Sequence, residues 1–487
     1  MIRRRTITSY VWNSVSGNKM VILSNCIRNF FRKFELIGNS VQGENPAPDN
    51  PQEIKSAGRK SKNLFNISDL KNGQVQSDGT IKAVGVYKSI VLNIKEDGKY
   101  FITFKKNDEY DVLYFTTLYS SEIFSNPYIN IYPDAKGTIL LKKGRNILSF
   151  KAKKNGAECP FINDYEIMIA AESETTDYEP YGYFLNVKAT GKNLFDQSKL
   201  ISGFINMTTG AFEESANTSF ANSLILDKPI LLKSGQTLVT SVDNKYPQNF
   251  LRYRTYRKDG TFLINNEPIS FSYKATEDLY VIALFYNGMS EEDKKSLQIE
   301  ISDKPTPYEP YTEQSVQIAL DEPLRGVGEY KDTITKDGVV RKIKRTVFDG
   351  SEDEKWVLSN DPKNVTTNRF MIGMDTINTY YKIFTMCDKL SWVKANNVDL
   401  VGQTTHGKAF YVTMPKELAP NLEAFKTWLS QNPLIVDYVL AEPVTEPLPE
   451  SVQQQLQALH SENGTTHVFV DSGEVEAGIN IEYKYKS

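Results

Sequence analysis

A repeated pair of four-residue tags constrains the fold of this chain more than any other feature. Lys62-Asn63-Leu64-Phe65 opens a segment and Tyr178-Glu179-Pro180-Tyr181 closes it. Both tags return 130 positions later, as Lys192-Asn193-Leu194-Phe195 and Tyr308-Glu309-Pro310-Tyr311. Two tags that recur at one shared offset indicate a duplicated module of about 120 residues, a usual domain size.

The residues before each closing tag alternate in the manner of a strand. The first copy has Ile167, Ile169 and Ala171 on one face, and the second has apolar residues 130 positions later, at Leu297, Ile299 and Ile301. This period of two predicts the same half-buried strand at the end of both modules. The Glu-Pro pair then favours an extended exit, because proline disfavours the α region in the residue before it. We therefore expect a stiff seam whose tyrosines can pack back onto the module.

The length and the turn pattern predict a mainly β protein of three or four domains. The chain has 487 residues and 27 tyrosines, and its Tyr-, Thr-, Ile- and Val-rich runs are broken by Gly, Asp and Asn. We expect two tandem jelly-roll β-sandwich modules followed by a mostly-β α+β C-terminal domain. The expected boundaries are 61–183 and 190–311 for the modules, 312–447 for the C-terminal domain, and 448–487 for a final helix and strands.

Turn residues between strand-like runs predict hairpins in each module. In the first module these turns fall at 96–99 and 143–144, and in the second at 233–236 and 258–260, with a further strand at 279–286. The C-terminal domain has another hairpin turn at 336–338.

One helix is expected late in the C-terminal domain. Leu422, Phe425, Trp428 and Leu429 share a face between Pro420 and Pro433, and a strand at 434–440 should run into Glu442-Pro443. A shorter helix and two closing strands should follow, at 452–459, 465–470 and 479–485. We expect three of the tryptophans in the core: Trp356, Trp392 and Trp428.

Residues 1–60 read as an attachment region. Residues 1–33 hold seven basic residues and no acidic one, while the whole chain has a net charge of −3. This segment could be a solvated or assembly-facing arm, or an electrostatic dock for an acidic partner. A short strand at 34–37 and a proline-rich spacer at 46–51 would complete the region.

The sequence offers no motif for a cofactor, a metal or nucleic acid. Cys26, Cys159 and Cys387 lie far apart, which suits a reducing cytoplasm rather than a disulfide framework. His406, His460 and His467 have no metal-ligand spacing, and His460 should end a helix. No glycine-rich phosphate loop follows a strand. We expect neither a signal peptide nor a membrane span.

Two alternating runs are candidates for sugar binding. Around residues 250–257, Leu251, Tyr253 and Thr255 should face the core, and the other set should point away from it: Arg252, Arg254 and Tyr256. The matching run of the first module has Tyr128, Asn130 and Tyr132 on one face. Aromatic rings beside hydrogen-bonding groups suit a pyranose. The alternative is that these are ordinary outer-face residues chosen for β propensity.

The tags and several further segments resemble tail and baseplate proteins of phages and prophages of Gram-positive bacteria, which contain carbohydrate-binding-module-like jelly rolls. The resemblance covers roughly residues 34–487 and includes three more motifs: Gly38-Asn39-Ser40-Val41-Gln42, Leu324-Arg325-Gly326-Val327-Gly328 with Lys331-Asp332-Thr333-Ile334, and Phe425-Lys426-Thr427-Trp428-Leu429.

The resemblance implies a non-enzymatic component of the virion, in the tail or baseplate, that is assembled in the bacterial host cytoplasm. It implies a receptor-binding role toward host cell-wall or capsular polysaccharide, other tail proteins as partners, and a homo-oligomer, with a trimer among the options. Two alternatives remain open. One is a purely structural spacer without a ligand, and the other is a polysaccharide depolymerase, which would need two suitably placed carboxylates.

Overall fold

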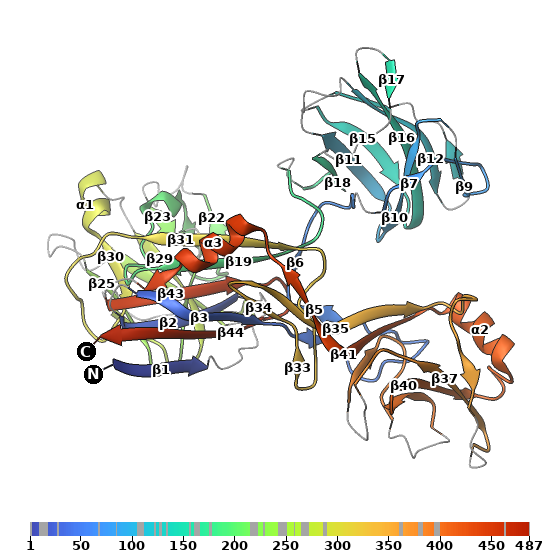
Figure 1. The fold of residues 1–487 in the computed structure, drawn as a ribbon. Coiled ribbons are helices and arrows are strands. Elements are labelled where there is room, and N and C mark those ends of the chain that lie inside the picture. Colours follow the sequence, from blue (N-terminus) through green and yellow to red (C-terminus); the bar gives the residue numbers. More distant parts are fainter. Residues whose placement is uncertain are drawn as a thin grey trace. The chain divides into compact units, whose positions relative to one another are not determined.

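The computed structural model is mainly β and antiparallel, as the sequence predicts (Figure 1). It describes residues 2–8, 18–26, 29–66, 69–83, 85–104, 112–120, 123–125, 129–132, 135–154, 157–159, 166–174, 178–214, 223–226, 229–241, 251–257, 259–263, 272–285, 290–359, 364–377, 383–393, 400–461 and 464–486. The chain forms two compact units. The first comprises Met1–Gly58, Leu185–Ile318 and Leu324–Ser487, and the second comprises Arg59–Phe184 and Ala319–Pro323.

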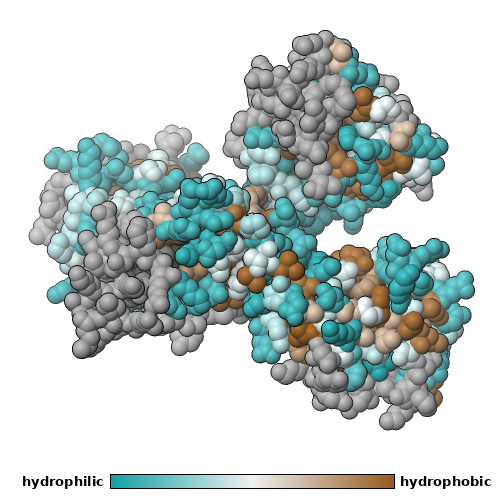
Figure 2. Space-filling view, viewed as in Figure 1, coloured by the Kyte–Doolittle hydropathy of each residue, from teal (hydrophilic) through white to brown (hydrophobic). Residues whose placement is uncertain are grey.

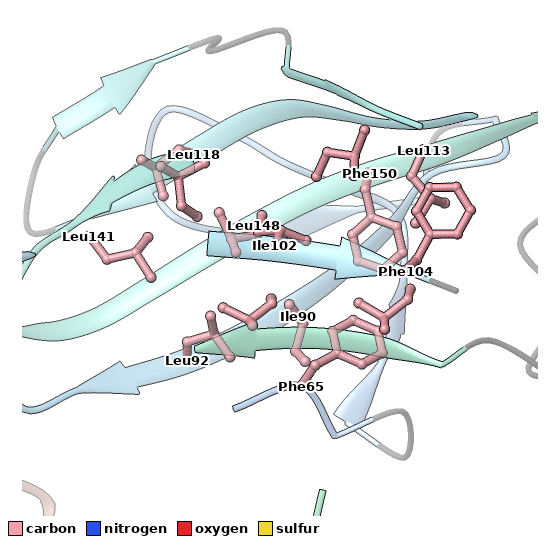
Figure 3. Packing of buried hydrophobic residues seen from close by; sticks show 14 of the residues in the cluster. Phe65, Ile90, Leu92, Ile102, Phe104, Leu113, Leu118, Leu141, Leu148 and Phe150 are labelled. Atoms are coloured by element: carbon pink, nitrogen blue, oxygen red, sulfur yellow. The ribbon is translucent and has the colours of Figure 1, made fainter. Parts of the chain in front are cut away.

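The first module consists of two antiparallel sheets around one apolar core. The smaller sheet has the order β15 (Gly137–Leu141), β11 (Gly98–Phe104), β18 (Ile167–Ala171). The larger sheet contains β7 (Lys71–Asn72), β10 (Lys88–Ile94), β12 (Val112–Ser120), β13 (Ile123–Ser125), β14 (Ile129–Ile131), β16 (Gly144–Lys154) and β17 (Ala157–Cys159). Figure 3 shows side chains from both sheets meeting in the core, among them Ile102, Phe104 and Phe150, together with Phe65 of the opening tag. Burial of such side chains supplies most of the stability of a sandwich.

The second module repeats this arrangement. Its larger sheet has the order β20 (Leu200–Ser202), β23 (Leu224–Leu226), β29 (Leu279–Phe285), β26 (Leu251–Arg257), β27 (Phe262–Leu263), and β24 (Ile230–Leu232) also pairs with β29. The smaller sheet is β28 (Ser272–Lys274), β25 (Thr237–Ser241), β30 (Gln298–Ile301). A 3-10 turn, Gln197–Lys199, and helix α1 (Glu291–Ser296) complete the described part.

The two modules share one strand order. In the first copy, β10, β12 and β16 of the larger sheet alternate along the chain with β11, β15 and β18 of the smaller sheet. In the second copy, β24, β26 and β29 alternate in the same way with β25, β28 and β30. Ile167 and Leu297 are both buried, 1% and 3% exposed. Each copy also has a small hairpin after its opening tag, β8 (Gln74–Val75) with β9 (Ile81–Lys82), and β21 (Phe204–Ile205) with β22 (Phe212–Glu213).

Three of the four predicted hairpins in the modules are wrong. β10 pairs with β16 and β7, whereas β11 pairs with β15 and β18, so the turn at 95–97 connects opposite sheets. The turns at 142–143 and 233–236 likewise cross between sheets. Gly- and Asp-containing turns serve both purposes, and the choice of pairing partner is made by burial of the inner faces. Only the turn at 258–260 joins paired strands, β26 and β27.

Strands from the two ends of the chain pair with each other. One sheet has the order β1 (Ile2–Thr8), β44 (Gly478–Lys486), β3 (Asn29–Ile37), β34 (Thr333–Thr335), β35 (Gly338–Phe348), β41 (Leu434–Pro447), β38 (Thr385–Cys387), and β42 (His460–Ser461) pairs with β3. A second sheet contains β2 (Asn18–Cys26), β43 (Gly464–Asp471), β19 (Tyr183–Thr190) and β31 (Glu313–Leu320). The expectation of a separate N-terminal arm is therefore wrong for β1, β2 and β3. Besides its basic residues, this segment contains Ile, Val, Phe and Thr residues, which favour strands.

The modules are inserted along the chain between strands. The first lies between β6 (Arg59–Lys60) and β19, and the second lies between β19 and β31. β6 pairs with Tyr183 and Phe184 at the start of β19, so the entry and exit of the first module are adjacent.

An α+β lobe is inserted between the paired strands β35 and β41. Its sheet has the order β36 (Val357–Leu358), β37 (Thr367–Gly373), β40 (Ala409–Pro415), β39 (Gly402–His406). The predicted helix is α2 (Leu422–Gln431), which begins after Asn421, whose side chain accepts a bond from the Ala424 amide. Phe425, Trp428 and Leu429 of α2 are buried, and the rings of Phe370 and Phe425 stack 4.0 Å apart.

Other details of the C-terminal part differ in degree from the predictions. β41 continues through Glu442-Pro443 to Pro447, with a register shift opposite Arg341 and Ile343, instead of ending near residue 440. The predicted hairpin of β34 and β35 and the second helix, α3 (Glu450–Ala458), are confirmed. His460 begins β42 rather than ending that helix. Trp356 and Trp428 are core residues, whereas Trp392 is only half-buried.

Candidate functional site

The asparagine of the first opening tag joins that tag to the closing tag. Asn63 is 1% exposed, and its Nδ2 donates to the carbonyls of Ile167 (2.9 Å) and Glu179 (3.0 Å). Its Oδ1 accepts from the amides of Phe65 (2.9 Å) and Ile169 (3.0 Å). The Glu179 carboxylate also pairs with Arg59 and accepts from the Lys62 amide. The tag therefore satisfies backbone groups along the free edge of β18.

Asn193 makes the same four contacts in the second module. Nδ2 donates to the carbonyls of Leu297 (3.2 Å) and Glu309 (3.0 Å), and Oδ1 accepts from the amides of Phe195 (3.0 Å) and Ile299 (3.2 Å). Because both copies use their tags in this way, the repeated tags are the closure of each module and not a ligand site. We call this arrangement of one asparagine with both tags the asparagine clasp.

The predicted sugar-binding residues of the second module lie under other side chains. Leu251 and Tyr253 face the core, as expected, but Arg254 on the other face is only 4% exposed. The Tyr256 hydroxyl donates to the Gly210 carbonyl (2.7 Å), and its ring packs on Phe262 at 5.2 Å. Arg252 is half-buried, with Nη1 3.9 Å from Met207 Sδ. The expectation that this set is open to solvent is therefore wrong, because the β21–β22 hairpin and its turn cover this face.

The predicted residues of the first module lie on an open face. Ile131 is buried at 1% exposure, whereas Tyr132 is 58% exposed and Asn130 is exposed. The alternation predicted for this run is confirmed for these positions. Tyr128 lies outside the described residues.

A further polar group on this face was not predicted, because its members come from three distant segments. Asn130 on β14 lies opposite Tyr114 on β12, and Tyr114 lies opposite Lys151 on β16. The Lys151 ammonium lies over the Tyr87 ring, 5.2 Å from its centroid, and pairs with the Glu158 carboxylate of β17. Burial alone would lower the pKa of Lys151, but Glu158 and the Tyr87 hydroxyl raise it, so this amine stays charged.

Two of the other motifs named above converge within the first unit. The Lys331 ammonium donates to Asn39 Oδ1 (3.0 Å), and the Gly326 amide donates to the Ser40 hydroxyl (3.1 Å). A Cβ on Gly326 would lie 2.4 Å from Lys331 Cδ, so a larger residue here would displace the Lys331 side chain. Burial lowers the pKa of Lys331. β4 (Ser40–Val41) pairs with β5 (Lys55–Ser56), and β32 (Gly326–Val327) pairs with β33 (Tyr330–Lys331) in a hairpin. The contacts above join β4 to this hairpin, which explains both motifs as structural.

Buried charges beside this joint are paired with opposite charges. Asp332 accepts from the amides of Arg325, Lys342 and Ile343 at 2.7–3.0 Å and lies 3.5 Å from Arg341 Nη1. Burial raises the pKa of Asp332, against these stabilising contacts. Asp437 accepts two bonds from the Arg345 guanidinium, at 2.7 and 2.9 Å. Such paired and satisfied groups indicate a structural network.

His467 and Cys387 are both buried. His467 is fully buried, neither ring nitrogen has a hydrogen-bond partner among the described residues, and burial lowers its pKa to about 4. Burial raises the pKa of the Cys387 thiol to about 12, which makes it inert near neutral pH. Over the described ranges, no group of three His, Cys, Asp or Glu side chains could hold a metal ion.

Exposed apolar residues gather on the lobe that carries β37 and β40, where Figure 2 shows hydrophobic residues between hydrophilic ones. They include Val357, Leu358, Val365 and Leu418, each at least 44% exposed.

Among the helices of the described part, none is long and apolar enough to cross a membrane.

The fold is that of a mainly β protein with a duplicated β-sandwich-like module. No protein-family model, curated protein or solved structure matches the chain.

Proposed function

We propose that this protein is a non-enzymatic component of a phage or prophage tail or baseplate that helps attach the virion to its host by binding cell-surface polysaccharide. The observation that carries the proposal is the open face of the first module, where Asn130 and the 58%-exposed Tyr132 lie together. Exposed aromatic rings beside amide groups can stack on a sugar ring and bond its hydroxyls. Partners would be other tail proteins and further copies of this chain, whose sites would add by effective concentration.

A purely structural role is the second candidate, and a specific observation favours it. The repeated tags form the asparagine clasp, and the predicted residues of the second module lie under the β21–β22 hairpin. In that case the modules would be spacers, and host recognition would belong to another protein. A depolymerase activity has no comparable support.

Binding of the full chain to immobilised cell-wall polysaccharide from Gram-positive bacteria, alongside an array of bacterial oligosaccharides, tests the first role against the second. We expect binding with weak affinity per site, strengthened on a dense surface by multivalency. If the folded protein binds none of the polysaccharides, the result would favour the structural spacer role. Release of reducing ends from the same material would instead indicate a depolymerase.

A further inference from the structure

We infer that the glycan site of the protein is a row of side chains that runs across the strands of the larger sheet of the first module, and that it binds a neutral oligosaccharide. The row consists of Tyr87, Lys151 with Glu158, Asn130 and Tyr132. This inference rests on the function proposed above and specifies the place and the chemistry of the site. It also replaces Arg252, Arg254 and Tyr256 as the ligand-contacting residues.

The row follows from strand register and from the alternation of buried residues. Ile131, Leu113 and Phe150 are buried in the core at 1% exposure or less. The residues next to Ile131 and Phe150 in sequence, Asn130 and Lys151, therefore lie on the opposite face of the larger sheet. Tyr87 joins the row because its ring carries the Lys151 ammonium. These strand positions are direct neighbours in the sheet. At about 4.8 Å per strand the row extends about 14 Å, enough for more than one sugar ring.

The hairpin of the first module leaves the Asn130 and Tyr132 end of this row exposed. Val75 of β8 donates its amide to the Ser149 hydroxyl (2.8 Å), and Ser149 bonds Ser89 (2.7 Å). A Cβ on Gly79, in the turn between β8 and β9, would lie 2.8 Å from the Tyr119 ring. The hairpin thus covers Ser89, Ser149 and Tyr119, whereas Asn130 and Tyr132 stay exposed. In the second module, Tyr256 lies beside the corresponding hairpin turn and is covered by it.

The charges of the row indicate the class of ligand. Lys151 and Glu158 are paired, so an anion or a cation would meet a repelling partner as well as an attracting one. Sugar hydroxyls both donate and accept, and they can bond an ammonium, a carboxylate and the Asn130 amide together. The rings of Tyr87 and Tyr132 supply apolar surface for the flat faces of the sugar. A neutral glycan fits this set better than an acidic polymer.

Affinities of the full-length protein and its variants for an array of neutral and acidic bacterial oligosaccharides test the inference. We expect binding to neutral members. Tyr87→Ala and Asn130→Ala should each lower the affinity about tenfold. Tyr256→Phe is the control, because it removes only the bond to Gly210 on the covered face of the other module. Melting temperatures of all variants show whether a loss of binding reflects a loss of fold, and Asn130→Ala, at an exposed position, should leave melting unchanged.

The possible outcomes separate this inference from the proposed function. Tenfold losses in Tyr87→Ala and Asn130→Ala, with Tyr256→Phe unchanged, support the row. Wild-type binding that survives both changes, or that is confined to acidic oligosaccharides, overturns the row and leaves the proposed function standing. No wild-type binding to any member overturns both.

Discussion

Asn63 and Asn193 each bond four backbone groups, three of which are buried. Their side chains lie between the opening tag, the last strand of the smaller sheet and the closing tag. An amide is suited to this place because it can donate twice and accept twice. Asn63→Ala should therefore lower the free energy of unfolding of the first module by about 3 kcal/mol. Thermal unfolding of the full chain measures this, and Asn130→Ala, on an exposed strand position of the same module, should change it by less than about 0.5 kcal/mol. Equal effects from both changes would contradict the clasp.

The buried His467 predicts a dependence of stability on pH. Its pKa is lowered to about 4 in the folded state, from 6.5. The unfolded chain therefore binds a proton that the folded chain refuses, and the stability present above pH 6.5 is lost as the pH falls to about 4. The loss should reach about 3 kcal/mol. His467→Leu removes the group, and since neither ring nitrogen has a partner among the described residues, the variant should be at least as stable near neutral pH.

Urea unfolding of wild type and His467→Leu at several pH values between about 7 and 4 measures this difference. Other groups titrate in the same range, so the informative quantity is the gap between the two proteins. A gap that does not change with pH would mean that His467 has the same pKa in the folded and the unfolded protein, which would contradict the prediction.

At the level of elements, the β21–β22 hairpin decides which face of the second module is accessible. Its turn contains Gly210, with φ at +72°, where a Cβ would lie 2.4 Å from Phe262 Cγ. Gly260, with φ at +85°, has nothing within 4 Å of the same position and provides a matched control. Gly260→Ala should cost about 1 kcal/mol for backbone strain alone. Gly210→Ala should cost about 3 kcal/mol, since it adds overpacking against the ring.

Melting temperatures of the two glycine variants test this difference. The added side chain of Gly210→Ala should also push the hairpin away from the sheet and expose Tyr256. The Tyr256 ring should then be iodinated faster than in the wild type. Equal melting temperatures for the two variants would show that the turn does not press on Phe262.

For the whole molecule, the pairing of N-terminal with C-terminal strands changes what a truncation should do. β1 pairs with β44 and β2 pairs with β43, so deletion of residues 1–33 removes both strands together with the first five residues of β3, and it leaves one edge each of β43 and β44 unpaired. We expect that variant to aggregate. Deletion of residues 1–9 removes only β1, at the edge of the sheet that contains β44, and should leave a soluble protein. Soluble yield and size-exclusion chromatography distinguish these outcomes. A soluble 34–487 chain with unchanged melting would contradict the pairing. Salt-sensitive docking of this segment to a partner protein stays a separate prediction.

The sequence by itself determined the features that depend on neighbours along the chain. Alternation at 129–132 and 251–255 identified which side chains enter the core, and the spacing of Phe425, Trp428 and Leu429 identified α2. The shared offset of the tags revealed the duplication, because insertion of one module twice leaves its local pattern intact.

Only the tertiary structure decided which strands pair and what covers each sheet. Turns that look alike join either paired strands or opposite sheets, because the partner is selected by burial of distant residues. Alternation marks Tyr256 and Tyr132 equally as outer-face residues. In the second module, a hairpin some 45 residues earlier in the chain covers Tyr256, whereas Tyr132 of the first module stays exposed. For the same reason Tyr87, Lys151 and Glu158 meet on one face although no local pattern connects them.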